Sequence, residues 1–392
     1  EVHGVPFNKE GWNIIVNEFD GYLPIRIDAV PEGTVMPTKN VQVQVINTDD
    51  RFYWLTSYIE TALLRAIWYP STVCTLSRRI KSIIKNGLEK TSDLPLDQLS
   101  FKLHDFGFRG VSSNESGMLG GMAHLVNFSG TDTIAGVLGA MKYYNSDVCG
   151  FSISANEHSN VVSWGKENEQ AAYENMFNLY AGENKIFACV SDSYDIYNTV
   201  ENIYGKNMKD KIINSGGTFV VRPDSGDPIT TPVKIIEMLM DSFGFEINSK
   251  GFKVLPSYIR VIQGDGINEH SISKIIDLMI SKELSIDNIA FGMGGALLQG
   301  VTRDDLKYAM KASARQSNSG EWFDIFKNPV GDSSKKSKAG VLGLEYDTKT
   351  NAFSTKRIED CSNNLLETVF LNGKLLKEFT FEEVRQNAKK GI

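Results

Sequence analysis

Charged and glycine-rich stretches follow short apolar runs at several places in this chain, and one stretch combines two chemically useful side chains. Arg222-Pro223-Asp224-Ser225-Gly226 places a guanidinium two residues before a carboxylate. An arginine offers a planar fork that pairs with two phosphate oxygens, and a carboxylate can hold ribose hydroxyls or a hydrated magnesium ion. Turns that contain Pro, Asp and Gly are common, so the alternative for this stretch is a surface turn with an internal Arg–Asp pair.

Two glycine-rich stretches, Gly264-Asp265-Gly266 and Gly292-Met293-Gly294-Gly295, are separated by one predicted strand–helix unit. Glycines let backbone N–H groups approach a phosphate closely, and the N-terminus of a following helix adds partial positive charge. Each stretch alone also fits a simple tight turn. Their occurrence at consecutive predicted strand ends favours phosphate binding.

A histidine and an aspartate end two successive apolar runs. His158 follows one run, and Asp192 follows the next. An aspartate that accepts a hydrogen bond from an imidazole fixes its tautomer and strengthens it as a nucleophile or base. The alternative is a histidine that only packs or lies at the surface. The sequence has no HxxxH motif or Cys/His cluster, which argues against a zinc site.

Several residues near predicted strand ends have both a structural and a binding interpretation. Asp132 either stabilises the start of a predicted helix by about 1 kcal/mol or accepts hydrogen bonds from a ligand. Phe106 lies close to Arg109 in the sequence and either packs in the core or stacks on a planar ligand. We expect His104 and His124 to be packed residues within strands.

The elements that must position these side chains are seven short apolar runs. They span residues 101–105, 123–128, 150–154, 186–191, 218–222, 258–263 and 288–291. Apolar residues at helical spacing follow three of the runs, and strands that alternate with helices predict parallel pairing. A barrel of parallel strands gathers the loops after its strands at one face. The residues above are therefore expected to converge on one site, and their chemistry suits a phosphorylated sugar.

The domain organisation follows from where this alternation begins and ends. We place an α/β barrel at residues 96–300. Residues 1–95 mix extended stretches with a helix, and residues 301–392 end in short extended runs. Neither flank resembles an independent domain. The simplest arrangement joins residues 1–95 and 301–392 into one α/β layer.

Composition excludes several classes of protein. The 392 residues carry a net charge of −7 at pH 7, which argues against nucleic acid as the main partner. No apolar run approaches the roughly 20 residues that span a bilayer, so no membrane partner is expected. The four cysteines lie far apart without a CxxC pair, which favours a reducing, cytoplasmic location.

Several long blocks of the sequence closely resemble the nicotinamide phosphoribosyltransferase family, a group of type II phosphoribosyltransferases. The resemblance runs from Gly11-Trp12-Asn13 nearly to the C-terminus. Its most specific blocks are Lys102-Leu103-His104-Asp105-Phe106-Gly107-Phe108-Arg109-Gly110-Val111-Ser112-Ser113, Gly130-Thr131-Asp132-Thr133, Glu157-His158-Ser159, Ser191-Asp192-Ser193-Tyr194-Asp195-Ile196-Tyr197, Arg222-Pro223-Asp224-Ser225-Gly226 and Val261-Ile262-Gln263-Gly264-Asp265-Gly266.

The resemblance implies an activity, a fold and partners. The family transfers the 5-phosphoribosyl group from phosphoribosyl pyrophosphate to nicotinamide, giving nicotinamide mononucleotide and pyrophosphate in NAD salvage. ATP hydrolysis is coupled through a phosphohistidine, and Mg²⁺ is carried by the diphosphate. The implied fold is an irregular parallel α/β barrel with a sandwich-like α/β domain from both chain flanks. The implied assembly is a homodimer with the site at the subunit interface.

The resemblance also assigns roles to residues. Asp132 resembles the carboxylate that recognises the nicotinamide amide, and Phe106 resembles the aromatic residue that stacks on its ring. His158 is similar to the histidine that ATP phosphorylates, with Asp192 beside it. The implied set for the diphosphate, the phosphates and the ribose is Arg109, Arg222, Asp224, Gly264, Asp265, Gly294, Gly295 and Arg303, with Lys311, Lys327 and Lys335 in a looser alignment. The expected catalytic residues are His158, Asp192, Arg222 and Asp224.

The sequence departs from the family at two places, and alternatives stay open. A segment before the Gly11-Trp12-Asn13 block supplies the family with a tyrosine that stacks on nicotinamide across the dimer, and it is absent from this sequence. A truncation, a second chain and a weakened site are all compatible with this. Ser154-Ala155-Asn156 stands where the family more often has Pro-Ala-Ala. The alternatives in function are a nicotinate phosphoribosyltransferase, which Asp132 disfavours, and a non-catalytic binding homologue.

Overall fold

A computed structural model describes residues 4–329, 331 and 336–390. The chain divides into two compact units, Glu1–Trp68 with Arg303–Ile392, and Tyr69–Thr302. The predicted boundary at 95/96 differs from this division, because helix α3 (Glu60–Thr91) contains the boundary and most of it packs in the second unit. At the other end, the boundary lies within two residues of the predicted position.

The second unit is built on a seven-stranded sheet in which every pairing is parallel. Its strand order is β4-β3-β11-β10-β7-β6-β5. The strands are β3 (Leu103–Asp105), β4 (Gly130–Thr131), β5 (Ser154–Ala155), β6 (Ile186–Val190), β7 (Thr218–Arg222), β10 (Ile259–Gln263) and β11 (Ile289–Met293). A parallel bridge between Gly130 and Phe151 joins the two edges, so the sheet curls into an irregular barrel. This confirms the predicted fold class.

One predicted strand was wrong. Residues 123–128 form the last turn of helix α4 (Asn114–Leu125) and the turn after it, and the strand itself is the two-residue β4. Ala123, His124 and Leu125 are all buried, and a short apolar run fits a buried helix end as well as a strand. The other six runs each contain or adjoin a strand.

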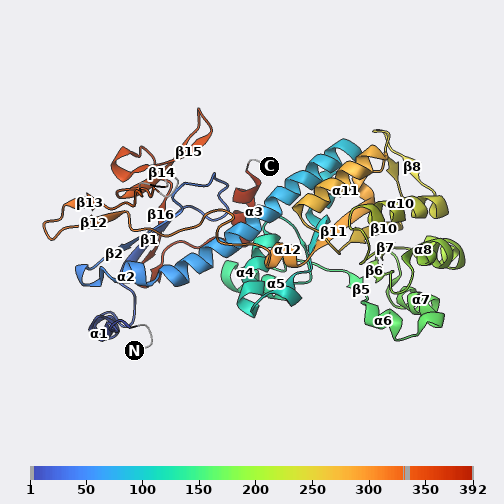
Figure 1. Cartoon of the computed structure of the whole chain (residues 1–392), viewed down its shortest axis with the longest axis horizontal. Helices are drawn as coiled ribbons and strands as arrows, with labels where there is room; N and C mark the ends of the chain where they lie inside the picture. Colours follow the sequence, from blue (N-terminus) through green and yellow to red (C-terminus); the bar gives the residue numbers. More distant parts are fainter. Residues whose placement is uncertain (1–3, 330, 332–335, 391–392) are drawn as a thin grey trace. The chain divides into compact units, whose positions relative to one another are not determined.

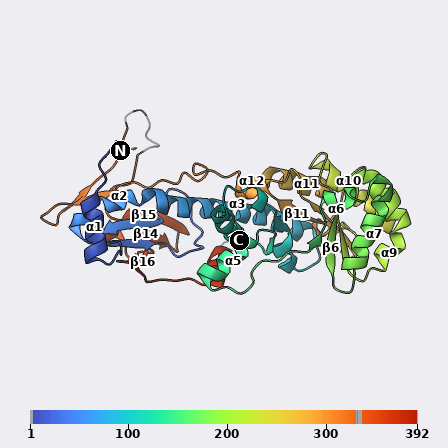
Figure 2. The same ribbon diagram turned by 90° about the horizontal axis from the view of Figure 1, so that it is seen from below.

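Helices cover the outer face of the barrel. Helix α10 (Thr230–Phe243) packs on β10, and α11 (Glu269–Ser281) lies beside α10 and the C-terminal part of α3 (Figure 1). Helix α7 (Glu169–Tyr180) packs against β6 (Figure 2). The remaining helices and small hairpin of this unit are α5 (Ile134–Tyr144), α6 (His158–Val162), α8 (Ile196–Asn198), the π-helix η5 (Thr199–Asn207), α9 (Lys209–Ile213), α12 (Gly295–Leu298), β8 (Glu246–Ile247) and β9 (Lys253–Val254).

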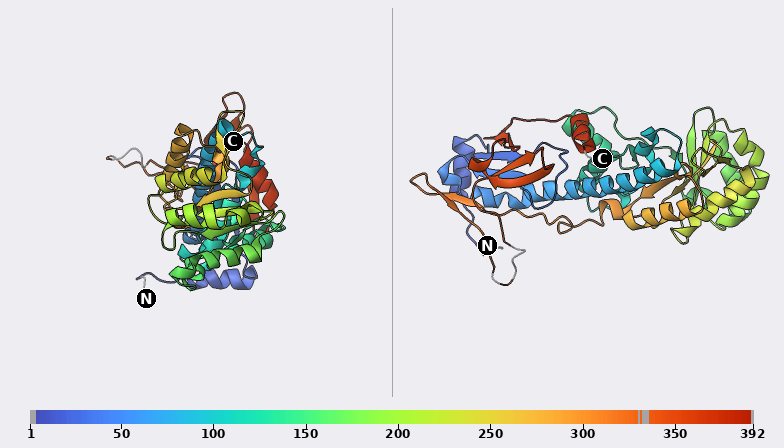
Figure 3. Two further views of the ribbon diagram at one scale, coloured as in Figure 1. Left: turned by 90° about the vertical axis from the view of Figure 1, so that its right-hand side faces the viewer. Right: turned by 90° about the horizontal axis from the view of Figure 1, so that it is seen from above.

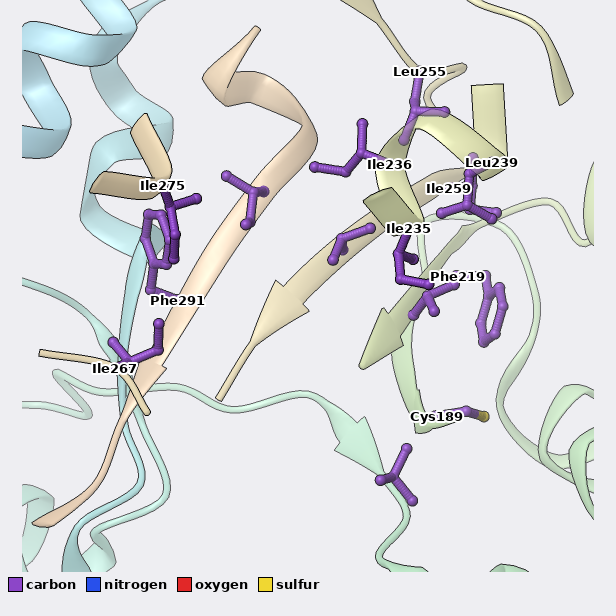
Figure 4. Packing of buried hydrophobic residues seen from close by; sticks show 14 of the residues in the cluster. Cys189, Phe219, Ile235, Ile236, Leu239, Leu255, Ile259, Ile267, Ile275 and Phe291 are labelled. Atoms are coloured by element: carbon purple, nitrogen blue, oxygen red, sulfur yellow. The ribbon is translucent and has the colours of Figure 1, made fainter. Parts of the chain in front are cut away.

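Strand side chains alternate between the helices and the barrel interior. The outward-facing set forms the main hydrophobic core, and Figure 4 shows part of it between the strands and α10 and α11. Phe219, Ile259 and Phe291 belong to this core and are fully buried. In each of these strands, the residues at the alternate positions must therefore point toward the barrel axis. This alternation decides which residues reach the site.

The first unit joins both ends of the chain in one antiparallel sheet of order β17-β16-β1-β2. Figure 3 shows its blue N-terminal strands beside red C-terminal ones. A small core of Ile15, Ile25, Phe52 and Leu55 lies against this sheet. The elements of the unit are α1 (Lys9–Glu18), β1 (Ile25–Ala29), β2 (Val43–Asn47), α2 (Leu55–Tyr58), β12 (Ala314–Gln316), β13 (Trp322–Asp324), β14 (Leu342–Asp347), β15 (Ala352–Arg357), β16 (Glu367–Leu371), β17 (Lys374–Leu375) and α13 (Phe381–Lys389). The predicted α/β domain from both flanks is confirmed.

None of the helices in the described part of the chain is both long and apolar enough to cross a membrane.

Candidate active site

Aliphatic side chains line part of the barrel interior. Ala188, Val220, Ile262 and Ala290 come from four neighbouring strands, and the ring of Phe106 packs against this cluster. Because Phe106 follows β3, it lies at the C-terminal end of the strands. These four aliphatic side chains form the floor of the candidate site.

Two glycines make the space for the Phe106 ring. A Cβ atom added at Gly292 would overlap the ring, and one added at Gly264 would lie 3.2 Å from its Cε2 atom. The backbone N–H of Phe106 donates to the carbonyl oxygen of Met293 at 3.0 Å, which fixes the ring beside β11. The ring therefore occupies space that is open because positions 264 and 292 have no side chains.

Asp132 is placed beside this ring by a histidine. His104 Nε2 lies 2.8 Å from Asp132 Oδ1, and the His104 ring centroid lies 5.1 Å from that of Phe106. Ser152 Oγ donates to the same carboxylate oxygen at 2.6 Å. Burial raises the pKa of Asp132, but the hydrogen bonds and nearby charges, including that of Arg222, outweigh it and lower the pKa overall. Asp132 is therefore an ionised acceptor at neutral pH.

The structure rules out the helix-cap interpretation of Asp132. Helix α5 begins at Ile134 with Thr133 as its N-cap, and Asp132 precedes the cap and faces His104 instead. His104 was predicted to be only a packed residue, and that prediction missed its contact with Asp132. The available signal was its position two residues before Phe106, since alternate strand residues share a face. His124 is fully buried as expected, but in helix α4.

His158 and Asp192 form a hydrogen-bonded pair. His158 is the first residue of α6, and its Nε2 lies 3.0 Å from Asp192 Oδ1. The Asp192 side chain is 4% exposed and that of His158 is 45% exposed. Asp192 Oδ2 also accepts from the backbone N–H of Asp224 at 3.2 Å and from the Ser225 hydroxyl. Because an ionised carboxylate only accepts, this contact favours a proton on Nε2, and in the neutral ring with that tautomer Nδ1 has the lone pair.

Arg222 and Asp224 form the internal pair that the surface-turn alternative required, but they do not lie in a surface turn. Arg222 Nη2 donates to Asp224 Oδ2 at 2.9 Å, and both side chains are less than a fifth exposed. The guanidinium carbon lies 5.6 Å from the centroid of the Phe106 ring. Arg222 Nε is buried and has no hydrogen-bond partner among the described residues. The pair therefore belongs to the same cluster as Asp132, Asp192 and Phe106.

The glycine-rich stretches adjoin this cluster. A Cβ atom added at Gly264 would lie 3.5 Å from Asp224 Oδ1, and one at Gly294 would lie 3.5 Å from the carbonyl oxygen of Phe106. Asp265 is exposed next to Gly264, and Gly295 begins helix α12. Arg109 is exposed in the short turn after Phe106.

The other predicted basic residues lie in the first unit or outside the described residues. Arg303 forms an ion pair with Asp304 at 2.9 Å. Lys311 and Lys327 are exposed, and Lys335 lies outside the described residues. The phosphate-binding roles of these four residues stay predictions.

The sequence profile of the Nicotinate phosphoribosyltransferase (NAPRTase) family matches residues 101–374, which include every barrel strand. The chain belongs to this family.

Relatives of this NAPRTase-family chain agree with the match. The chain is 48% identical over 392 residues to a nicotinamide phosphoribosyltransferase of Xanthomonas campestris pv. campestris (strain 8004), covering 98% of this chain and 83% of that protein. It is 32% identical to a nicotinamide phosphoribosyltransferase of Acinetobacter baylyi (strain ATCC 33305 / BD413 / ADP1), covering 93% of this chain and 76% of that protein. The predicted resemblance is confirmed.

A solved structure supports the fold. The nicotinate-nucleotide pyrophosphorylase of Pyrococcus furiosus aligns with a TM-score of 0.60 at 17% identity, covering 93% of this chain and 80% of that one. At this identity the likeness concerns the fold alone.

Proposed function

We propose that this chain is a nicotinamide phosphoribosyltransferase that makes nicotinamide mononucleotide and pyrophosphate from nicotinamide and phosphoribosyl pyrophosphate in NAD salvage. The observation that carries the proposal is the convergence of an ionised acceptor, Asp132, an aromatic ring, Phe106, and a guanidinium, Arg222, at one end of the barrel. The names of the relatives at 48% and 32% identity support the same activity.

The base-binding part of the site favours an amide over an acid. The Phe106 ring offers a stacking surface for a pyridine ring. The amide N–H of nicotinamide can donate to Asp132, whereas the carboxylate of nicotinate would meet a like charge there, at a cost of several kcal/mol. This supports nicotinamide over nicotinate as the substrate, although the family profile has the name of the nicotinate enzyme.

The transfer step needs positive charge where the diphosphate leaves. The pyridine nitrogen forms a bond to the anomeric carbon as the bond from that carbon to the diphosphate oxygen breaks, and the electron pair leaves with pyrophosphate. Arg222 and Arg109 are the guanidinium groups that would bind this diphosphate. A preorganised donor in a site that excludes water contributes about 3 kcal/mol to such a step.

Mg²⁺ fits this site as an ion carried by the substrate. The described residues contain no group of three His, Cys, Asp or Glu side chains that could hold a metal. Mg²⁺ usually takes one or two carboxylates together with phosphates and waters, and Asp224 is the carboxylate suited to that role. Bound there, Mg²⁺ would neutralise charge on the leaving diphosphate.

ATP would act through His158. With its proton on Nε2 and donated to Asp192, the Nδ1 lone pair is free to form a bond to the γ-phosphorus of ATP as the bond to ADP breaks. The electron pair leaves with ADP, and the Nε2 proton stays in the hydrogen bond to Asp192. Water would later hydrolyse the phosphohistidine and restore the imidazole.

A homodimer with the site at the subunit interface is supported by an exposed apolar face. Ile134, Leu138 and Met141 lie on one side of α5 and are 62%, 56% and 44% exposed, and α5 begins two residues after Asp132.

Leu138→Glu is expected to convert the dimer into monomers and to abolish most synthesis, as measured by light scattering and product formation. Ile247→Glu, at an exposed apolar residue in β8, should change neither. A monomeric wild-type chain with full activity would contradict this assembly.

The proposed function is tested by product formation. The chain is mixed with nicotinamide, phosphoribosyl pyrophosphate and Mg²⁺, with and without ATP, and nicotinamide mononucleotide and pyrophosphate are measured. We expect synthesis in both mixtures and more with ATP. Synthesis only when nicotinate replaces nicotinamide would support the acid-specific alternative. Binding of both substrates without pyrophosphate release would support the non-catalytic alternative.

The glycine at position 292 gives a further test of the base-binding part. Gly292→Ala is expected to displace the Phe106 ring, because the added Cβ atom would overlap it, and to raise the KM for nicotinamide about tenfold. Gly264→Ala, where the Cβ atom would lie 3.2 Å from the ring, should have a smaller effect. Gly331→Ala, with no described atom within 4 Å of its Cβ position, serves as the control. An unchanged KM in Gly292→Ala would remove Phe106 from base binding.

A further inference from the structure

A buried polar network lies on the face of β6 and its extension that points away from the site. Its members are Glu169, Tyr173, Ser191, Thr199 and Tyr204, and all are buried. Because alternate residues of an extended chain point to opposite faces, Ser191 points toward the helices while Asp192 points into the site. The network and the His158–Asp192 pair therefore share one stretch of backbone.

The hydrogen bonds of the network have a defined direction at Ser191. Its hydroxyl donates to the carbonyl oxygen of Cys189 at 2.8 Å, so its oxygen must accept from the Tyr204 hydroxyl 3.0 Å away. Burial raises the pKa of Tyr204 well above its ordinary value, so this hydroxyl keeps its proton at neutral pH. Tyr204 is thus placed to donate to the residue before Asp192.

A second part of the network lies further from the site. The Tyr173 hydroxyl donates to Glu169 Oε1 at 3.0 Å, and the Thr199 hydroxyl donates to the same oxygen at 3.4 Å. The rings of Tyr173 and Tyr204 pack edge to face with centroids 5.1 Å apart. Tyr173 therefore packs against the Tyr204 ring. Among the described residues, no hydrogen bond joins its hydroxyl to Ser191.

Tyr204 belongs to an unusual helix. The nine-residue π-helix η5 (Thr199–Asn207) follows α8, and π-helical turns are rare and often occur at functional sites. Gly205 lies next to Tyr204, and a Cβ atom added there would lie 2.5 Å from Ser242 Oγ of α10. The irregular helix thus packs tightly against α10 while it holds the Tyr204 ring against Phe219 of β7 and the Tyr204 hydroxyl beside Ser191.

We propose that Tyr204 is a positioning residue that aims Asp192 at His158. The Asp192 side chain bonds three donors, and the backbone of residues 191 and 192 sets the direction from which it reaches them. On one side, the Ser191 N–H donates to the carbonyl oxygen of Arg222 at 2.9 Å. On the other, Tyr204 holds the Ser191 side chain. The proposal rests on the proposed role of His158 as phosphoryl acceptor.

The experiment compares Tyr204→Phe with the matched control Tyr173→Phe. Each variant removes one buried hydroxyl from the same network, but only the first removes the donor to Ser191. We expect Tyr204→Phe to lower the ATP stimulation of synthesis about tenfold while synthesis without ATP changes less than threefold. Tyr173→Phe should leave the stimulation within twofold of wild type, with a comparable loss of thermal stability. Equal effects of the two variants on stimulation, or no effect of Tyr204→Phe, would overturn the proposal.

One further measurement and one further variant keep the proposal separate from ATP coupling and from misfolding. Nitrogen NMR of His158 reports the tautomer directly, and we expect the Nε2–H form to lose population in Tyr204→Phe but not in Tyr173→Phe. This outcome would support the positioning role even if the wild type showed no ATP stimulation, which would refute only the coupling. If Tyr204→Phe does not fold, Ser191→Ala removes the acceptor instead. An unchanged tautomer and unchanged coupling in that variant would overturn the proposal.

Discussion

Replacement of His158 by alanine is expected to abolish ATP-coupled synthesis and to leave a slower, uncoupled transfer. The imidazole is the group with a free nitrogen lone pair in the His158–Asp192 pair, so its removal leaves ATP without its acceptor. Phe106, Asp132 and Arg222, which are proposed to bind the base and the diphosphate, are untouched by this change. The ratio of ADP released to nicotinamide mononucleotide formed should therefore fall to the background level, while synthesis without ATP persists.

The control for this prediction is a histidine outside the cluster. His270 is exposed in the first turn of α11, and His270→Ala should keep the wild-type ratio of ADP to product. A phosphate signal on His158, followed by mass spectrometry after incubation with ATP, should be absent from His158→Ala. Coupling that survives the loss of His158 would remove this residue from the mechanism.

Replacement of Asp132 by asparagine is expected to relax the preference for nicotinamide toward nicotinate. The change removes a negative charge at the place where the two bases differ, and a like-charge contact costs several kcal/mol. We expect the ratio of kcat/KM for nicotinamide to kcat/KM for nicotinate to fall by about a hundredfold or more, since each 1.4 kcal/mol is a factor of ten. Asp132→Ser should act in the same direction.

The matched control variant keeps the charge of Asp132 and removes one hydrogen-bond donor to it. Ser152→Ala removes a hydroxyl that donates to Asp132 but leaves the carboxylate ionised, so the preference should persist. Because the pKa of Asp132 is lowered from 3.8, the wild-type preference should also hold throughout the neutral and mildly acidic range. An unchanged ratio in Asp132→Asn would show that another group selects the base.

Much of the barrel could be predicted because its strands are buried on both faces. Residues 186–190 and 219–221 are continuous apolar runs, which is typical of strands in a covered parallel sheet. The same property explains the failure at residues 123–128, where a buried helix end has the same composition. The boundary within α3 was missed because no glycine or polar stretch marks it. Pro70, inside α3 and next to that boundary, was the available signal.

The candidate site was predictable where a residue stands at a strand end and not where its role depends on a contact across the barrel. Asp192 follows β6 and Asp224 follows β7, and the backbone N–H of Asp224 donates to Asp192, so these two strand ends meet as expected. The contact of His104 with Asp132 joins β3 to the residue after β4, and the alternation along β3 predicts only the face on which His104 lies. Tyr204 was missed for the same reason, since it reaches Ser191 from a helix thirteen residues away.

The barrel closes between β4 and β5 through few backbone hydrogen bonds. Each strand has two residues, and the backbone contact across the gap consists of hydrogen bonds from Thr131 and Phe151, at 2.9 and 2.8 Å. Local opening starts where few backbone bonds hold neighbouring segments, so amide exchange should begin here. Asp132 and Ser152 face each other across that gap, and a bound base that engages Asp132 would slow this exchange. A bound substrate would thereby stabilise the β4–β5 side of its own binding site against local opening.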